Sequence, residues 1–269
     1  KIQNVPGYVK VNGVKQLSGD YELANAKLLN KPDGYYIAIT TYKKKEKEDF
    51  QPNTVIGLDM GVKTHITLSD GREINSTIKE TERLKRLQRK LARQEKGSNN
   101  YAKTRHQIQI EYSKIDNRKN DLANKVVHDL LMHEFVFMQD ENLKAWRRKS
   151  KTHKNGRKLQ HSALGRVKEK LVKHPRVFVS HKSVATTKTC VCGKRNVISL
   201  SQRTYSCNFC GYQAPRDIHA AMNMVFLGQE QIPVDRRDFK LVERGSDFES
   251  NLIAFKRLAV KQEAPKSLA

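Results

Sequence analysis

The chain has 269 residues, of which 52 are Lys or Arg and 28 are Asp or Glu, so its formal net charge at pH 7 is +24. This excess predicts a polyanionic partner, and the length suffices to bury a hydrophobic core. No run approaches the roughly 18 apolar residues of a membrane span and no signal peptide is recognisable, so no membrane partner and a cytoplasmic location are expected.

Residues 1–45 have the alternation of β-strands. The segments 21–29 and 35–42 flank Lys31-Pro32-Asp33-Gly34, which is typical of a hairpin turn. These strands have few apolar residues and exposed edges. We therefore expect them to belong to a barrel whose other strands lie elsewhere.

A second β unit is predicted over residues 54–75, where an apolar strand ends in Asp59. Residues 76–130 then carry Leu and Ile at helical spacing among many basic residues, with a break at 97–100. This pattern predicts a long basic helical hairpin. The basic side chains of its first helix that are candidates for nucleic-acid binding are Arg83, Arg86, Arg89, Lys90 and Arg93.

The next segment is predicted to alternate between short strands and helices. A buried strand over 135–138 leads to Glu141, Ser162 is placed to cap a helix through Lys173, and 176–180 reads as another strand. Three further basic residues follow the acid and are candidates for contact with a substrate strand: Arg147, Arg148 and Lys149.

The four cysteines of the chain form two close pairs that suit one tetrahedral Zn²⁺. They are Cys190, Cys192, Cys207 and Cys210. The first pair has one intervening residue where a zinc knuckle normally has two, which requires a tighter turn. The alternative is a pair of buried free thiols with a strained or empty site. His181 is a weaker candidate, as a substitute metal ligand.

Three acids stand where catalytic carboxylates often lie. Asp59 and Glu141 follow strands, and Asp217 begins a helix predicted to run to about Leu227. Carboxylates converging from separate elements can hold the two Mg²⁺ ions of phosphodiester hydrolysis. Taken singly, each acid is equally well explained as a solvated strand end or a helix cap.

Three motifs in this order resemble the RuvC motifs of the TnpB family, the transposon-encoded RNA-guided DNA endonucleases related to type V CRISPR effectors. They are Gly57-Leu-Asp59-Met-Gly61, Gln139-Asp-Glu-Asn142, and the block from Thr186 through the cysteines to Arg216-Asp217-Ile-His-Ala-Ala-Met-Asn223. The helical hairpin and the N-terminal strands are also similar to that family.

The resemblance implies an α/β fold: an RNase H-like (RuvC) mixed sheet with a helical-hairpin insertion and a zinc ribbon, preceded by a partial β-barrel (wedge) segment. The implied domains are 1–50 (partial wedge), 51–185 (first part of the nuclease, with the hairpin at 76–130), 186–214 (zinc ribbon), 215–228 (last nuclease helix) and 229–269 (C-terminal tail, partly ordered).

The implied function is Mg²⁺-dependent cleavage of DNA selected by a guide RNA, in a nucleoid-associated prokaryotic protein. Asp59, Glu141 and Asp217 would then bind two Mg²⁺ ions, and the cysteines one structural Zn²⁺. Guide RNA and target DNA are the implied partners. A recognition domain and the front of the wedge are not in this chain, so we expect them to precede Lys1.

The middle motif departs from the family pattern, and this leaves the identity of the middle catalytic acid open. Commoner members of the family have the middle Glu at the position of Gln139, two residues before Glu141. Residues two apart in a strand share a face, so Glu141 is favoured, with Asp140 as the fallback. If neither acid reaches the site, the chain is a guide-RNA-dependent DNA-binding protein or repressor. A cut-and-join transposase is a third possibility.

Overall fold

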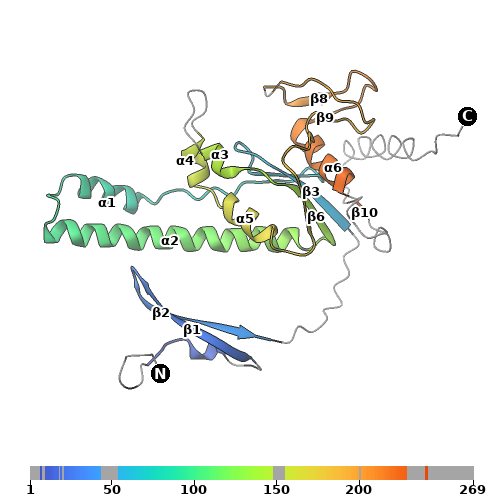
Figure 1. Ribbon diagram of the computed structural model, residues 1–269. Helices are drawn as coiled ribbons and strands as arrows, with labels where there is room; N and C mark the ends of the chain where they lie inside the picture. Colours follow the sequence, from blue (N-terminus) through green and yellow to red (C-terminus); the bar gives the residue numbers. More distant parts are fainter. Residues whose placement is uncertain are drawn as a thin grey trace, which may run out of the picture.

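The computed structural model (Figure 1) describes residues 7, 10–17, 19, 21–43, 54–147, 155–199, 201–228 and 240–241. Within them lie a small β-hairpin, a mixed sheet with helices on both faces, a long helical hairpin and a cysteine-containing ribbon. No helix in the described parts of the chain is both long and apolar enough to cross a membrane.

The N-terminal hairpin consists of β1 (Glu22–Lys31) and β2 (Gly34–Tyr42), paired antiparallel as predicted. Every residue of β1 is exposed. A short 3-10 helix, Val14–Leu17, precedes it. Residues 8 and 9 of a strand expected before it lie outside the described residues, and the barrel remains a prediction.

The central sheet has the strand order β5-β4-β3-β6-β7 and mixes parallel and antiparallel pairs, which confirms the predicted mixed sheet. β4 pairs antiparallel with β3 and with β5, whereas β6 pairs parallel with β3 and with β7. The strands are β3 (Thr54–Met60), β4 (Ile66–Leu68), β5 (Glu73–Ile74), β6 (Phe135–Gln139) and β7 (Val177–Ser180). A further short strand, β10 (Lys240–Leu241), pairs with the start of β3, inside the segment predicted as a tail.

Alternate residues of the central strands enter two separate cores because successive side chains in a strand point to opposite faces. Ile56 and Val136 belong to the main core, together with apolar residues of α2 and α5. Val55 and Phe137 belong instead to a second core, completed by Met224 of α6. The face that carries Val55 is therefore the face that α6 covers.

The predicted helical hairpin is confirmed, with α1 spanning Glu82–Ala92 and α2 spanning Asn99–Leu130. Thr81 and Ser98 cap the two helices, each accepting a backbone N–H through its hydroxyl. Leu84 and Ile108 are among the apolar residues that pack between the helices. Figure 1 shows the two helices side by side, extending away from the sheet.

Three shorter helices connect β6 to β7: α3 (Leu143–Arg147), α4 (Gly156–Gln160) and α5 (Leu164–Leu171). The helix predicted from Ser162 through Lys173 is present as α5, but the prediction that Ser162 caps it is wrong. The Ser162 hydroxyl donates to the carbonyl of Leu159 in the preceding turn, and α5 begins only after Ala163, which makes no side-chain cap.

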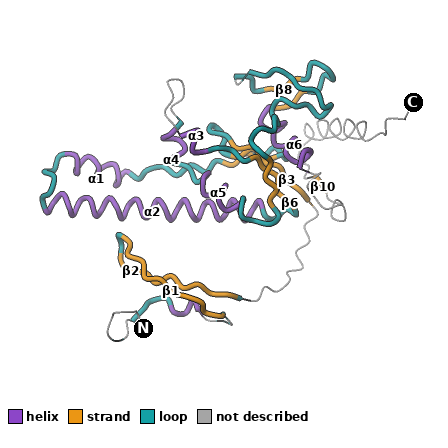
Figure 2. Tube along the Cα trace, in the orientation of Figure 1, coloured by secondary structure: helices purple, strands orange, loops and turns teal. Residues whose placement is uncertain are grey.

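The ribbon contains the antiparallel pair β8 (Thr204–Ser206) and β9 (Gln213–Pro215), and loops make up most of the rest (Figure 2). β9 leads directly into α6 (Arg216–Gly228), which matches the predicted helix within one residue at each end. Tyr205 of the ribbon and Met222 of α6 belong to one buried cluster. The ribbon and α6 therefore share a core.

Candidate active site and metal centre

Asp59 lies near the end of β3. It follows Gly57 by two residues and Val55 by four, and such residues share one face of a strand, so Asp59 is on the face covered by α6. Its side chain is partly buried there. Gly57 lets the helix approach closely: a Cβ at that position would lie 2.0 Å from the backbone oxygen of Ala221. This contact fixes α6 against the strand that carries Asp59.

Asp217 occupies the first turn of α6, where the positive end of the helix dipole favours an ionised carboxylate. Arg216 approaches its Oδ1 from Nε at 2.9 Å and from Nη2 at 2.8 Å. Arg203 of the ribbon lies farther away, with Nη1 3.9 Å from Oδ2. The side chain is 35% exposed, so the carboxylate remains accessible to a ligand.

Glu141 follows β6 at the same edge of the sheet, because β3 and β6 are parallel and end side by side. The strand does not continue to it: the N–H of Glu141 donates to the carbonyl of Gln139 at 2.9 Å, which closes a tight turn. The N–H of Asp140 donates to the carbonyl of Ser180 at 2.9 Å. The position of Glu141 thus depends on a turn and not on the strand alternation we expected.

Two of the acids act electrostatically on the third. Burial, followed by the charges of Asp217 and Glu141, raises the pKa of Asp59 from 3.8 to about 7, and Arg216 partly opposes this shift. Burial also raises the pKa of Glu141, against the lowering effect of Lys168. The negative charges of Asp217 and Glu141 therefore act on Asp59 although the three residues come from distant segments, and a divalent cation bound at Asp59 would relieve this repulsion.

Gln139 has a structural position that the sequence did not reveal. Its buried amide nitrogen donates to the carbonyls of His181 at 3.2 Å and of Val184 at 2.6 Å. A carboxylate has no proton to donate, so Glu at this position would face two carbonyl oxygens without a hydrogen bond. The amide fits this site, and the acid is provided two residues later.

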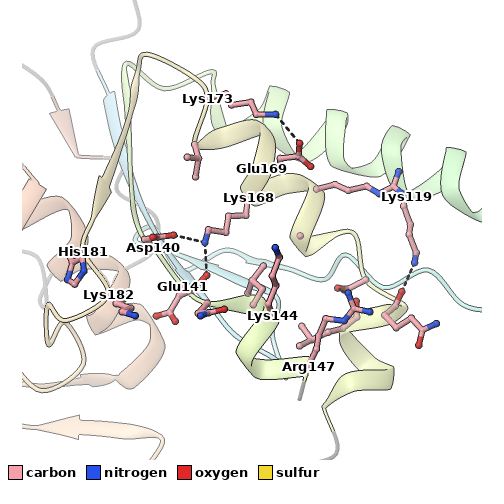
Figure 3. A pocket seen from close by; sticks show the side chains of 18 residues that line it. Lys119, Asp140, Glu141, Lys144, Arg147, Lys168, Glu169, Lys173, His181 and Lys182 are labelled. Carbon is pink, nitrogen blue, oxygen red and sulfur yellow. Dashed lines mark hydrogen bonds and ion pairs between the residues drawn. The ribbon is translucent and has the colours of Figure 1, made fainter. Parts of the chain in front are cut away.

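Asp140 is engaged by Lys168. The Lys168 Nζ lies 2.6 Å from Asp140 Oδ1 and 2.6 Å from the backbone oxygen of Glu141 (Figure 3). This ion pair lowers the pKa of Asp140. Asp140 is therefore the weaker candidate of the two adjacent acids.

A pocket of about 790 Å³ opens beside Glu141 (Figure 3). It is lined by Asp140 and Glu141 on one side, and its lining is rich in cationic side chains. The basic residues are Lys119, Lys144, Arg147, Arg166, Lys168, Lys173 and Lys182. Such a lining suits a phosphate backbone that leads to the acids.

The other predicted basic residues lie on α1 or outside the described residues. Arg86, Arg89, Lys90 and Arg93 line a shallow hollow of about 520 Å³ on the surface of α1. Arg83 instead points toward Glu111 of α2, with Nε 3.5 Å from Oε1. Two of the residues predicted to follow Arg147, namely Arg148 and Lys149, lie outside the described residues.

The four cysteines converge on one point. Their sulfur atoms all lie within 4.8 Å of one another, and no other group of three or more His, Cys, Asp or Glu in the described parts of the chain is so arranged. Cys190 Sγ and Cys210 Sγ are 3.6 Å apart, and Cys192 Sγ and Cys207 Sγ are 3.7 Å apart. A Zn–S bond of about 2.3 Å in a tetrahedron puts sulfurs about 3.8 Å apart, so the cluster is consistent with Zn²⁺.

The short spacing of the first pair is accommodated by a glycine. The N–H of Gly193 donates to the carbonyl of Cys190 at 2.9 Å, and Gly193 has a φ of 79°, which favours glycine. In the second pair, burial opposes ionisation of Cys207. Backbone N–H groups and the Asn196 amide outweigh this effect and lower the pKa of the thiol to about 6. Burial instead raises the pKa of the Cys190 and Cys210 thiols, so of these three thiols Cys207 ionises most readily.

His219 and Trp146, two residues near the candidate site in the sequence, have structural positions. His219 is fully buried, lies 2.9 Å from the carbonyl of Thr189 through Nε2, and stacks on Tyr205 with ring centroids 3.7 Å apart. Burial lowers its pKa to about 4. Trp146 packs against the main core.

The residues near the acids that sequence reasoning missed are cations. Lys168 is one of several lysines on a basic helix, and nothing in its spacing distinguishes it from Lys170. Arg203 comes from a loop with no recognisable motif. Only their contacts in the folded chain give them a place at the site.

Comparison with known proteins agrees with these features. Residues 38–134 match the family model OrfB_IS605, described as "Probable transposase", and residues 163–224 match the model of the Cas12f1-like TNB domain. The chain is 28% identical over 246 residues to the candidate RNA-guided DNA endonuclease InsQ of Escherichia coli K12, and 28% identical over 189 residues to a candidate RNA-guided DNA endonuclease of Streptomyces pristinaespiralis.

The alignments cover 82% and 64% of this chain but 60% and 45% of those relatives, so the chain spans about half of their length. Two solved structures are also similar. One is a CRISPR-Cas12f ternary complex, with a TM-score of 0.41 and 18% identity over 78% of this chain and 46% of that one. The other is a Cas12f1-sgRNA-target DNA complex, with a TM-score of 0.32 and 17% identity over 74% of this chain and 55% of that one.

Proposed function

The chain belongs to the TnpB/OrfB_IS605 family, and from this premise we propose that it is the nuclease part of an RNA-guided DNA endonuclease. Asp59, Glu141 and Asp217 are its catalytic acids, at the edge of an RNase H-like sheet. The sheet order β5-β4-β3-β6-β7, antiparallel on one side of β3 and parallel on the other, supports the fold assignment.

The observation that carries the proposal is the environment of Asp59. Its pKa is raised to about 7 by burial and by the charges of Asp217 and Glu141, which come from segments far apart in the sequence. Strongly shifted carboxylates in contact with like charges are typical of catalytic sites. Ordinary solvated strand ends would not influence one another in this way.

The donor set fits Mg²⁺, because three carboxylates provide hard oxygen ligands and a negative field. Asp59, Glu141 and Asp217 would hold two such ions, which would supply Lewis acidity for activating water and stabilising the leaving oxygen. The protein holds Asp217 in place through Arg216 and through the packing of α6 on Gly57. The four-cysteine ribbon holds the start of α6 through their common core.

Nucleic acid is proposed to reach the site along the basic pocket beside Glu141. Its lysines and arginines suit phosphate contacts, which position a strand without reading its sequence. The basic surface of α1 is proposed to hold the guide RNA or its duplex with DNA. Base pairing with the guide would select the target.

The proposal predicts loss of cutting when an acid is neutralised. The complete protein, purified with its co-expressed guide RNA, is incubated with labelled single-stranded DNA in Mg²⁺ or in EDTA. Asp59→Asn, Glu141→Gln and Asp217→Asn should each lower the Mg²⁺-dependent cleavage rate by at least about 100-fold, because each removes a metal ligand. RNA binding should be unchanged.

Asp121→Asn is the matched control, since this exposed acid on α2 pairs only with a neighbouring lysine, Lys125, at 2.8 Å. It should cut at the wild-type rate. Retention of Mg²⁺-dependent cutting by Asp59→Asn would refute the assignment of the site.

A second candidate function, guide-RNA-dependent DNA binding without cleavage, is favoured by the amide at Gln139. Commoner relatives have the acid there, and in this chain that side chain is buried against two carbonyls. Wild-type protein that binds guide and target but does not cut in Mg²⁺ or Mn²⁺ would support this function.

A further inference from the structure

We propose that Lys168 is a positioning residue that determines which of two adjacent acids enters the catalytic site. This inference rests on the proposed function and extends it. Lys168 also lines the basic pocket, but its ammonium group contacts the turn after β6, and the role inferred for it is to position that turn. It holds the turn after β6, so that Asp140 is retained outside the site and Glu141 faces Asp59.

Lys168 contacts the turn at two points, and we call this pair of contacts the clamp. One ammonium group reaches the side chain of Asp140 and the main chain of Glu141, each at 2.6 Å. Figure 3 shows the Lys168 side chain descending from α5 between them, with the two carboxylates pointing in different directions. The Lys168 side chain is only 20% exposed, whereas that of Asp140 is 57% exposed.

The rest of the turn explains why a clamp is needed. β6 ends at Gln139, whose amide is committed to the carbonyls of His181 and Val184. Asp140 and Glu141 come directly after this fixed residue. The N–H of Asp140 still donates to β7, at Ser180, but the strand does not extend to Glu141. Side chains that orient metal ligands by hydrogen bonding contribute about 10- to 100-fold to metal affinity or activity.

α5 is well placed to provide this support. Leu164, Val167 and Leu171 are fully buried in the main core. The helix is thus fixed to the sheet, and the Lys168 ammonium is held at a defined point beside the turn. A lysine on a loosely packed helix would not define the position of its neighbours.

The test compares Lys168→Met with Lys168→Arg and Lys170→Met. Methionine keeps the apolar stem and removes both hydrogen bonds, whereas arginine keeps the charge and can donate to two oxygens at once. Lys170 is an exposed lysine on the same helix, and its replacement removes one positive charge in the same way.

Two measurements are made on the complex with guide RNA. The first is the cleavage rate as a function of Mg²⁺ concentration. The second is Mn²⁺ binding without DNA, followed by electron paramagnetic resonance, after subtraction of the signal of Asp59→Asn. Lys168→Met should weaken Mn²⁺ binding and slow cleavage at low Mg²⁺ by about 10- to 100-fold. Lys168→Arg should recover most of the Mn²⁺ affinity and most of the cleavage rate. Lys170→Met should match the wild type in both measurements.

Equal behaviour of Lys168→Met and Lys170→Met in both measurements would overturn the inference. A lower melting temperature of Lys168→Met that Lys168→Arg does not share, with normal Mn²⁺ binding, would assign Lys168 a purely structural role and would also overturn it. If instead Asp59→Asn still cuts, the proposed function fails, which is a distinguishable result.

Discussion

At the scale of single residues, Asp59 makes the stability of the protein depend on pH. Its pKa in the folded chain is about 7, above the ordinary value of 3.8, so folding favours the protonated form. The resulting stabilisation is present below about pH 4 and is lost as the pH rises through about 7. In EDTA, we expect the free energy of unfolding to fall by on the order of 4 kcal/mol over this range relative to Asp59→Asn.

Urea denaturation of both proteins at a series of pH values measures this difference. Comparison with Asp59→Asn removes the contributions of the other titrating groups, which both proteins share. If the free energy of unfolding changed with pH in the same way for both proteins, Asp59 would titrate as an ordinary surface acid. Added Mg²⁺ should reverse the trend, because a metal binds the ionised form.

The sequence predicts these residues unequally well. Asp59 and Asp217 are recognisable because a strand end and a helix start are local features. Which of Asp140 and Glu141 faces the site is not local. In the inference proposed above, the answer depends on Lys168 and on the carbonyls that bind Gln139, all of which come from later segments.

At the scale of elements, the packing of α6 on β3 depends on the absence of a side chain at Gly57. A Cβ there would lie 2.0 Å from the oxygen of Ala221 and 2.8 Å from Cγ2 of Val225. Gly57→Ala should therefore lower the free energy of unfolding by about 1–3 kcal/mol, as overpacking does. It should also slow cleavage, because the helix that carries Asp217 must move away from Asp59.

Thermal unfolding and the cleavage assay measure the two effects of Gly57→Ala. Gly165→Ala is the control for stability, since Gly165 lies in α5 with no atom within 4 Å of its added Cβ. Alanine is the better helix former, so this variant should be neutral or more stable by up to about 1 kcal/mol. Equal stability of the two variants would show that α6 adjusts without cost.

Strongly periodic elements were predictable and weakly periodic ones were not. The helical hairpin has an apolar seam that includes Leu84, Ile108 and Ile115, and such seams are visible in sequence. α5 begins at Leu164 because tertiary contacts hold it, without a capping side chain. β10 has two residues and exists only through its pairing with β3, which no local pattern encodes.

At the scale of the whole molecule, the cysteine ribbon and the sheet should respond differently to loss of metal. Cys192→Ser removes one ligand of the proposed zinc site and should unfold the ribbon, because structural zinc supplies folding energy. Hydrogen exchange should then accelerate at Tyr205 and Cys207 while the amides of Ile56 and Val136 stay protected. The metal content of the purified variant should fall from about one zinc per chain.

Cleavage by Cys192→Ser should also be lost, even in excess Mg²⁺, since the ribbon shares its core with α6. Ser183→Ala, in the exposed turn where Ser183 hydrogen-bonds His181, is a control outside the ribbon. Unchanged protection of Tyr205 in Cys192→Ser would mean that the apolar cluster alone maintains the ribbon.

The position of α6 in the sequence has a consequence for biosynthesis. Translation reaches α6 only after every strand of the β5-β4-β3-β6-β7 sheet has been made. A nascent or truncated chain that ends before α6 contains Asp59 and Glu141 but lacks Asp217, and it leaves Phe137 and its neighbours uncovered. Exposed apolar surface of this kind attracts chaperones and proteases. A chain interrupted before α6 is therefore a degradable fragment that lacks one of the three proposed catalytic acids.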